Sequence, residues 1–264
     1  MLQTIAHPTD FSPESSAAFG HALAWAVREK CHLELLHVRD PSVRDDFAHF
    51  PHVREALQRW GMLDAAARIE DIVTITGITV RKAEIRDVDP VDGVARYLAT
   101  HKPDLVVMAT HGRTGLNRWL KGSVSAQIAQ ETLVPTLLLG PHARSLVDEK
   151  TGSLEFRRVL VPVDDHPPAG RGLARLRDLL SDMEIELDLV HVGDTPLELA
   201  GEDAVRQLEG PVIEAILAEA ENADLVAMPT AGPHGMLEAL RGSTTEQVVR
   251  DSPRPVLALP TRTD

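Results

Sequence analysis

The feature that most constrains the fold is a glycine-rich stretch that occurs twice. In the N-terminal half it reads ATHGRTGLNRWLKGS (109–123), and in the C-terminal half PTAGPHGMLEALRGS (229–243). Three glycines and the final serine recur at a constant displacement of 120 positions. The tripeptide DLV at 104–106 recurs at 224–226 with the same displacement. Identity at this many ordered positions indicates an internal duplication of one unit.

The two repeats also open alike, with PTD at 8–10 and PVD at 162–164. In the first repeat, apolar runs alternate with segments of helical periodicity. They predict strands at 2–7, 31–38, 80–85, 105–109 and 136–139, and helices from Ser12-Pro13 onward, at 53–72, at 91–101 and at 124–131. Such alternation implies right-handed crossovers and a parallel sheet covered by helices on both faces.

The second repeat is a shortened version of the first. From the opening aspartate to the first loop glycine there are 102 positions in the first repeat and 68 in the second. The loss falls between a strand at 186–191 and a helix at 211–221, so only 204–208 remains as a third strand and the second helix is absent. The sequence thus predicts a domain at 1–141, a polar linker at 142–156 and a shortened domain at 157–264.

Composition narrows the function classes. A net charge of −13 disfavours nucleic-acid binding, which needs clustered cations. The single cysteine, Cys31, excludes an internal disulfide and is expected to be a small buried residue. No apolar run reaches the length of a membrane span, and the start lacks the layout of a signal peptide. The expected location is the cytoplasm.

The glycine-rich loop of the first repeat follows a strand end and leads into a helix at Ser123-Val124. Ligands of open parallel sheets bind beyond the carboxyl ends of the strands. Glycines let backbone N–H groups approach a ligand, and a helix start adds unpaired donors. Gly122 and Ser123 are therefore a candidate phosphate seat. The alternative is that the glycines serve turns alone, and the capping-box spacing from Ser243 to Glu246 favours a structural role in the second copy.

The glycine spacing, behind an apolar strand and ahead of a final "VP-aliphatic" strand, resembles the universal stress protein family, as do PTDFS near the start and LLHV at 35–38. The resemblance covers nearly all of the first repeat and, with gaps, the second. It implies an α/β fold of two open parallel-sheet domains, each with strand order 3-2-1-4-5. It also implies ATP binding in many members and pairing of domains along their last strands.

Carried over residue by residue, the resemblance places Asp10 and the Val38 backbone at the adenine, Met108 and Ala109 near the ribose, and the loop at the phosphates. The cofactor-binding set in the first repeat comprises Pro8, Thr9, Asp10, Val38, Met108, Ala109, Gly112, Arg113, Gly122, Ser123 and Val124. The chain departs from the family at Ala109, where the family has the first loop glycine. Whether magnesium accompanies the nucleotide stays open.

A second site would use Asp164, Val192, Gly232, Gly242, Ser243 and Thr244. Here Pro229 replaces the first loop glycine, which removes an N–H and fixes φ. Its loop carries Arg241 opposed by Glu238, whereas the first loop has three cations. Anion binding is therefore expected to be weaker, which predicts a competent first site and a degenerate second copy.

Three functions fit this pattern. The first is an ATP-binding regulatory protein of the stress response, and the second is an enzyme of the wider nucleotide-binding class. The third is a scaffold that has lost nucleotide binding. No glycine-rich loop follows the first strand and no Walker lysine follows the glycines, so we expect at most slow ATP hydrolysis and assign no catalytic residue.

Other polar residues receive structural interpretations. His37 and His191 end matching strands and are expected to share a structural place. His49 and His52 flank Pro51 in a loop, so no metal site is assigned to them. The terminal strands at 136–139 and 256–259 are expected to pair the two repeats within one chain. Homodimerisation through another face stays open.

Overall fold

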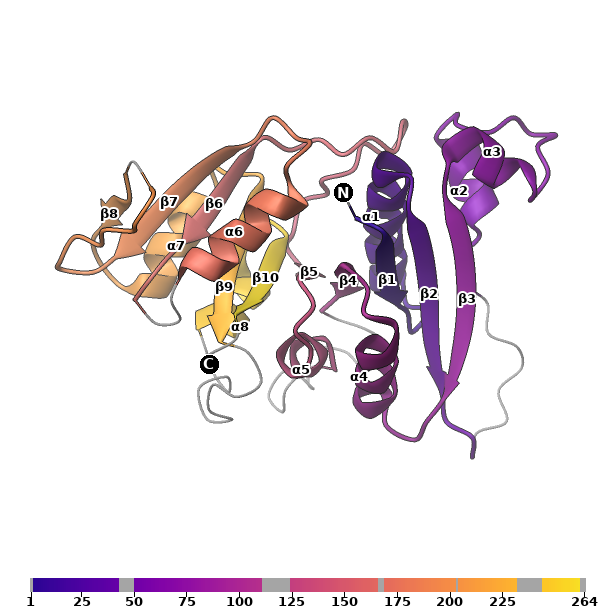
Figure 1. Cartoon of the computed structure of the whole chain (residues 1–264), viewed down its shortest axis with the longest axis horizontal. Helices are drawn as coiled ribbons and strands as arrows, with labels where there is room; N and C mark the ends of the chain where they lie inside the picture. The colour runs from indigo at the N-terminus through magenta and orange to yellow at the C-terminus, as the bar shows by residue number, and fades with distance from the viewer. Residues whose placement is uncertain are drawn as a thin grey trace. The chain divides into compact units, whose positions relative to one another are not determined.

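The computed structural model describes residues 2–42, 50–110, 124–165, 169–202, 204–231 and 244–261. Its elements form two compact units, each with its own core (Figure 1). The N-terminal unit comprises Leu2–Ser125 and Ser145–Glu155. The C-terminal unit comprises Ala126–Arg144 and Phe156–Asp264. The segment Ser145–Glu155 thus belongs to the N-terminal unit although chain on both sides of it belongs to the other.

The N-terminal unit is built on four parallel strands in the order β3-β2-β1-β4. Their bounds are β1 Thr4–Pro8, β2 His32–Arg39, β3 Thr79–Arg86 and β4 Leu105–Ala109. Helices α1 Pro13–Glu29, α2 Val53–Arg59, α3 Asp71–Thr76 and α4 Pro90–His101 connect them. Helix α1 packs on β1 and β4, and α4 packs on β2 and β3. Both sheet faces are therefore covered, which explains the continuous apolar runs of the inner strands.

Local signals placed most helix ends correctly. Helix α1 begins as predicted, with Ser12 Oγ accepting from the Ser15 amide at 3.1 Å and Pro13 in the first turn. The single helix predicted over 53–72 is wrong, because α2 ends at Arg59 and α3 starts only at Asp71. Gly61 takes a left-handed φ of 69° just after α2, a conformation that does not continue a helix.

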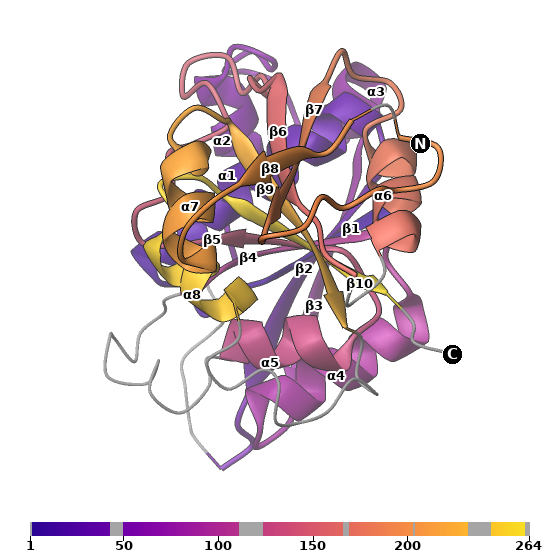
Figure 2. The ribbon, with the colours of Figure 1, turned by 90° about the vertical axis from the view of Figure 1, so that its left-hand side faces the viewer.

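The C-terminal unit contains the second repeat together with the last strand and most of the last helix of the first. Its strands are β5 Thr136–Leu139, β6 Arg158–Pro162, β7 Glu186–Val192, β8 Arg206–Leu208, β9 Leu225–Ala231 and β10 Val256–Thr261. Their order is β8-β7-β6-β9-β10-β5, so the expected 3-2-1-4-5 order of the second repeat is confirmed. The helices are α5 Val124–Glu131, α6 Ala169–Leu179, α7 Val212–Ala220 and α8 Thr244–Asp251. Figure 2 shows α6 on one side of these strands and α7 and α8 on the other.

Strand β5 pairs with β10, and this pair is antiparallel whereas the other strand pairs of the unit are parallel. Leu137 stands opposite Leu257, and Leu138 opposite Val256. All four residues are buried. The last strand of the first repeat therefore adds to the sheet of the second.

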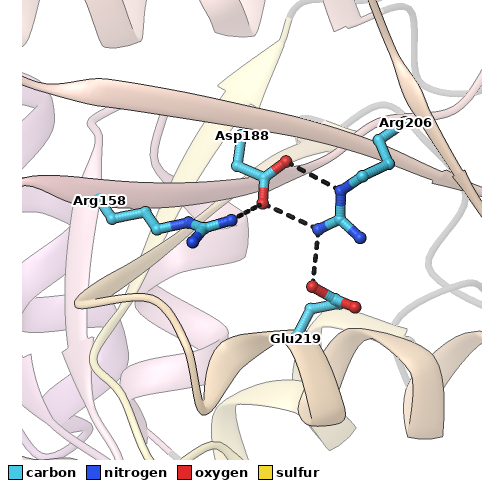
Figure 3. Close-up of polar contacts among 4 residues, drawn as sticks. All are labelled: Arg158, Asp188, Arg206 and Glu219. Carbon is cyan, nitrogen blue, oxygen red and sulfur yellow. Dashed lines mark hydrogen bonds and ion pairs between the residues drawn. The ribbon is translucent and has the colours of Figure 1, made fainter.

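The shortened repeat keeps its third strand without the helix that precedes it in the first repeat. In the described stretch between β7 and α7, the one regular element is the three-residue β8. Arg206 on β8 bonds Asp188 of β7 at 2.8 Å and Glu219 of α7 at 2.6 Å. Arg158 of β6 bonds Asp188 as well, at 2.9 Å, so the carboxylate lies between two guanidinium groups (Figure 3). This ion-pair network attaches the short strand to its neighbours.

Candidate functional site

Each repeat anchors the start of its first strand with one aspartate. Asp104 Oδ2 accepts from the amides of Gln3 and Thr4 at 2.7 and 3.0 Å. Asp224 Oδ2 accepts from Arg157 and Arg158 at 2.8 and 3.0 Å. The repeated DLV tripeptide thus has a structural cause, because its carboxylate fixes the amino end of the strand that leads to the candidate site.

The carboxyl ends of the first two strands are joined in the same way in both repeats. The Thr9 amide donates to Leu36 O and the His37 Nδ1–H donates to Thr9 O, both at 2.8 Å. In the second repeat Val163 donates to Val190 O at 2.8 Å, and His191 donates to Val163 O at 3.1 Å. The shared structural place predicted for the two histidines is confirmed.

The turn after β1 is held by its own side chains. Asp10 Oδ1 accepts from the Ser12 amide at 3.0 Å and from Ser12 Oγ at 2.6 Å. Thr9 Oγ1 accepts from the Phe11 amide at 3.1 Å and from Ser15 Oγ at 2.8 Å. Phe11 between them has a left-handed φ of 62°, which is costly for an aromatic residue and is sustained by these bonds. The Asp10 carboxylate is therefore fixed at the carboxyl end of β1.

Val38 directs its backbone toward the open side of β2. The Leu36 carbonyl accepts from Thr9, whereas the Arg39 carbonyl accepts from Asp87 beyond β3. Because backbone groups of alternate residues in a parallel strand point to opposite neighbours, the Val38 N–H and C=O point to the β1 side. The paired register of β1 ends at Pro8 opposite Leu36, so Val38 lies past it. Val38 thus presents one donor and one acceptor on the β1 side, past the last paired residue of β1, which is followed two residues later by Asp10.

Met108 and Ala109 end β4 on the other side of β1. The strand order reverses at β1, which is where ligands of open α/β sheets bind. Met108 is buried, so its side chain belongs to the core, and Ala109 is half-buried. Val124 begins α5 as predicted. The loop residues Gly112, Arg113, Gly122 and Ser123 lie outside the described residues.

His7 is a residue of this region that the sequence analysis missed. Its side chain is fully buried, and burial lowers its pKa from 6.5 to about 4, against smaller opposing effects of the Val107 carbonyl and Asp10. Its Nδ1–H donates to Val107 O at 2.8 Å, while Nε2 has no hydrogen-bond partner among the described residues. The second repeat has Val161 at this place, also buried. The sequence signal that could have identified His7 is the presence of a histidine within an otherwise apolar strand.

The second repeat differs from the first at the carboxyl ends of its strands. Asp164 is exposed, and its Oδ1 accepts from the Asp165 amide at 2.7 Å instead of from a helix-capping serine. Val192 is half-buried at the end of β7, and Thr244 begins α8. Gly232, Gly242 and Ser243 fall outside the part of the chain that the structure describes.

Pro229, which stands where the first repeat has Ala109, is accommodated by a glycine of α6. A Cβ on Gly172 would lie 3.0 Å from Pro229 Cβ and 3.1 Å from its Cγ. The equivalent residue of α1 is Ala18. The exchange of alanine for proline on the strand is thus matched by an exchange of alanine for glycine on the helix.

Metal and thiol chemistry find little support in the described residues. No group of three or more His, Cys, Asp and Glu side chains there is placed to hold a metal ion. His52 lies 3.6 Å from Glu55 in an exposed pair, and His49 is outside the description. Cys31 is buried as predicted, and burial raises the pKa of its thiol to about 12. None of the described helices is long and apolar enough to cross a membrane.

The model of the universal stress protein family matches residues 1–140 and 201–260 of the chain. The chain belongs to the universal stress protein family. A universal stress protein of Methanocaldococcus jannaschii is 27% identical over 145 residues, which are 53% of this chain and 82% of that protein. One of Thermus aquaticus is 27% identical over 140 residues, 53% of this chain and 99% of its own length. Half of this chain thus matches a nearly whole relative, as a duplication requires.

Several solved structures match almost the whole chain. A universal stress protein from Archaeoglobus fulgidus has a TM-score of 0.65 at 22% identity and covers 97% of this chain and 96% of its own. A universal stress protein structure from Pseudomonas aeruginosa has a TM-score of 0.64 at 15% identity, covering 98% and 93%. At these identities the likeness shows the fold, and it confirms the expected α/β class.

Proposed function

We propose that this universal stress protein is an ATP-binding regulatory protein with its working site in the first repeat. The observation that carries the proposal is the backbone of Val38, which presents a donor and an acceptor on the β1 side past the end of the paired register, while Asp10 is held in the turn that follows β1. An adenine edge has the complementary acceptor and amine. The site would comprise Pro8, Thr9, Asp10, Val38, Met108 and Ala109, with Gly112, Arg113, Gly122, Ser123 and Val124 toward the phosphates.

Calorimetric titration of the full chain with ATP, ADP and AMP, each with and without magnesium, tests this proposal. Gly122→Val places a side chain where close backbone approach to phosphate is proposed, and we expect it to abolish binding. Gly242→Val makes the same change in the second repeat and is the matched control, which should leave binding intact. Equal affinity of the wild type and Gly122→Val would refute the site.

The second repeat is proposed to be a degenerate copy. Pro229 lies within β9 opposite Leu259, and it lacks the N–H that Ala109 has at the matching position of the first repeat. Asp164 is exposed. A titration stoichiometry of one nucleotide per chain is expected. Two equal sites per chain would contradict the proposed asymmetry, even with the first site correct.

A scaffold without nucleotide is the second candidate, favoured by Ala109 and Pro229 in place of glycines. It predicts that the purified protein carries no nucleotide detectable by mass and binds none in titration. A slow ATPase predicts steady phosphate release, and a flat trace over hours excludes it. The regulatory proposal expects bound nucleotide and no sustained turnover.

We also propose that the terminal strands pair the two repeats within one chain, in the cytoplasm. The antiparallel register of Leu137 with Leu257 supports the pairing. In a background without Cys31, cysteines at these two positions should form a disulfide inside the monomer. A disulfide found only between chains would instead indicate pairing between two copies. The single cysteine of the sequence, which is buried, supports the compartment.

A further inference from the structure

The segment Ser145–Glu155, here called the inter-repeat arm, is a hairpin. Glu155 donates its amide to Leu146 O at 2.7 Å, and Asp148 donates to Ser153 O at 2.9 Å. Val147 and Leu154 form an antiparallel bridge. The segment for which the polar composition predicts a linker thus contains an antiparallel turn, and residues 149–151 at its tip are exposed.

The arm packs on its own N-terminal unit through a small set of buried residues. Leu146 and Val147 are buried. Gly152 has a left-handed φ of 70°, and a Cβ at this position would overlap the ring of Trp60. A side chain at position 152 would therefore require Trp60 to shift before the arm could dock as it does here.

One buried histidine of α1 holds the arm. His21 is 3% exposed, its Nδ1 lies 2.9 Å from Ala17 O, and its Nε2 lies 3.1 Å from the Leu146 amide nitrogen. A carbonyl only accepts and an amide N–H only donates, so both ring nitrogens have assigned roles. The ring is the neutral tautomer with its proton on Nδ1. A second proton on Nε2 would face the Leu146 N–H and remove the acceptor.

We propose that His21 is a pH-sensitive latch that docks the inter-repeat arm when neutral and releases it when protonated. The arm lies in the chain that connects β5 with β6. Its release therefore increases the length of undocked chain between these two strands. Release breaks the bonds and packing that the arm itself makes, whereas the hydrogen bonds within α1 and within the sheet do not depend on the arm. Release is therefore a local opening and not global unfolding.

The electrostatic surroundings set the direction of the switch. Burial lowers the pKa of His21, and the Ala17 carbonyl opposes this effect. The charged and titratable groups of α1, of the strands β1, β2 and β4 that it contacts, of α2 with the residue before it, and of the arm are Glu14, Arg28, Glu29, His7, His32, Glu34, His37, Arg39, His52, Arg54, Glu55, Arg59, Asp148, Glu149, Lys150 and Glu155. None of these groups, as far as the described residues show, contributes to the lowering of the His21 pKa. The latch is thus closed at neutral pH and opens as pH falls below the ordinary histidine range.

Hydrogen exchange of the full chain, measured residue by residue between pH 7 and pH 5, tests the latch. An opening that takes up one proton lowers the protection factor of the Leu146 amide about tenfold per pH unit once His21 titrates. The helical amides of α1 should keep their protection over the same range. In His21→Gln no group titrates at this place, so the Leu146 protection factor should not change with pH.

His101→Gln is the matched control. His101 donates Nδ1–H to the carbonyl four residues earlier, as His21 does, but it is exposed. Its variant should keep the wild-type pH dependence. Gly152→Ala should leave Leu146 unprotected at every pH. The proposal is overturned if Leu146 protection is independent of pH in the wild type or equally pH-dependent in His21→Gln, if α1 and the arm lose protection together, or if Gly152→Ala stays docked.

Discussion

Replacing His7 with valine, the residue at the equivalent position 161, should reduce the loss of stability in acid. The His7 pKa is about 4 in the folded chain and 6.5 without burial. Between these two pH values His7 is protonated in the unfolded chain and neutral in the folded chain, so the free energy of unfolding falls as the pH falls. A gap of about 2.5 units at 1.36 kcal/mol each amounts to about 3 kcal/mol of stability lost by pH 4.

Urea unfolding of the wild type and His7→Val at pH 7, 5.5 and 4 measures this difference. The variant also loses the bond to Val107 O, so the decisive quantity is the change of each protein with pH and not their difference at one pH. We expect the wild type to lose about 3 kcal/mol more than the variant. His101→Gln, which alters an exposed histidine, should behave as the wild type. Equal acid losses in wild type and His7→Val would refute the assignment of a neutral buried His7.

Three further changes test the framework around the site by urea unfolding. Asp104→Ala leaves two strand amides without their acceptor and should cost about 1–3 kcal/mol, and an unchanged midpoint would contradict its anchoring role. The methyl group of Gly172→Ala would contact Pro229 too closely and should cost about 1 kcal/mol of stability or more. Adding Pro229→Ala should restore this stability. A double variant as unstable as Gly172→Ala alone would exclude the contact. Burial, the largest influence, raises the pKa of Asp188, but the hydrogen bonds from Arg206 and Arg158 leave this pKa lowered overall. Asp188→Asn should therefore cost about 1 kcal/mol of stability at pH 7, and less as the pH falls through the lowered pKa of Asp188. A cost that does not change with pH or salt would argue against the ion-pair network.

The sequence predicted the fold well because its signals are local. The duplicated spacing and the apolar alternation located β4, α5 and β5 to the residue, and Ser12-Pro13 located the start of α1. The segment 53–72 failed for a physical reason. Its buried residues, among them Leu57, Trp60 and Leu63, have an apolar periodicity close to helical, but Gly61 turns the chain and the burial continues without a helix.

The candidate site was predictable only in part, since its geometry depends on pairing between distant strands. PTD at 8–10 indicates a strand end, yet the direction of the Val38 backbone follows from the register of β2 with β1 and β3. The arm shows the same limit. Its sequence is polar enough for a linker, and only the approach of Gly152 to Trp60 and of Leu146 to His21 makes it part of a compact unit.

Because the chain contains two copies of one unit, contacts that are present in both copies can be separated from contacts that are present in only one. The aspartate anchors at 104 and 224 and the histidine bonds at 37 and 191 recur with similar distances, so they belong to what any copy needs to fold. Apart from the shortened stretch between β7 and α7, two differences lie on the strands that lead to the candidate site, where His7 becomes Val161 and Ala109 becomes Pro229. Burial of a polar ring costs stability, and the second copy has a buried valine in its place. This pattern agrees with the proposal that the working site lies in the first copy, because a second copy without a site has no need to keep the buried histidine.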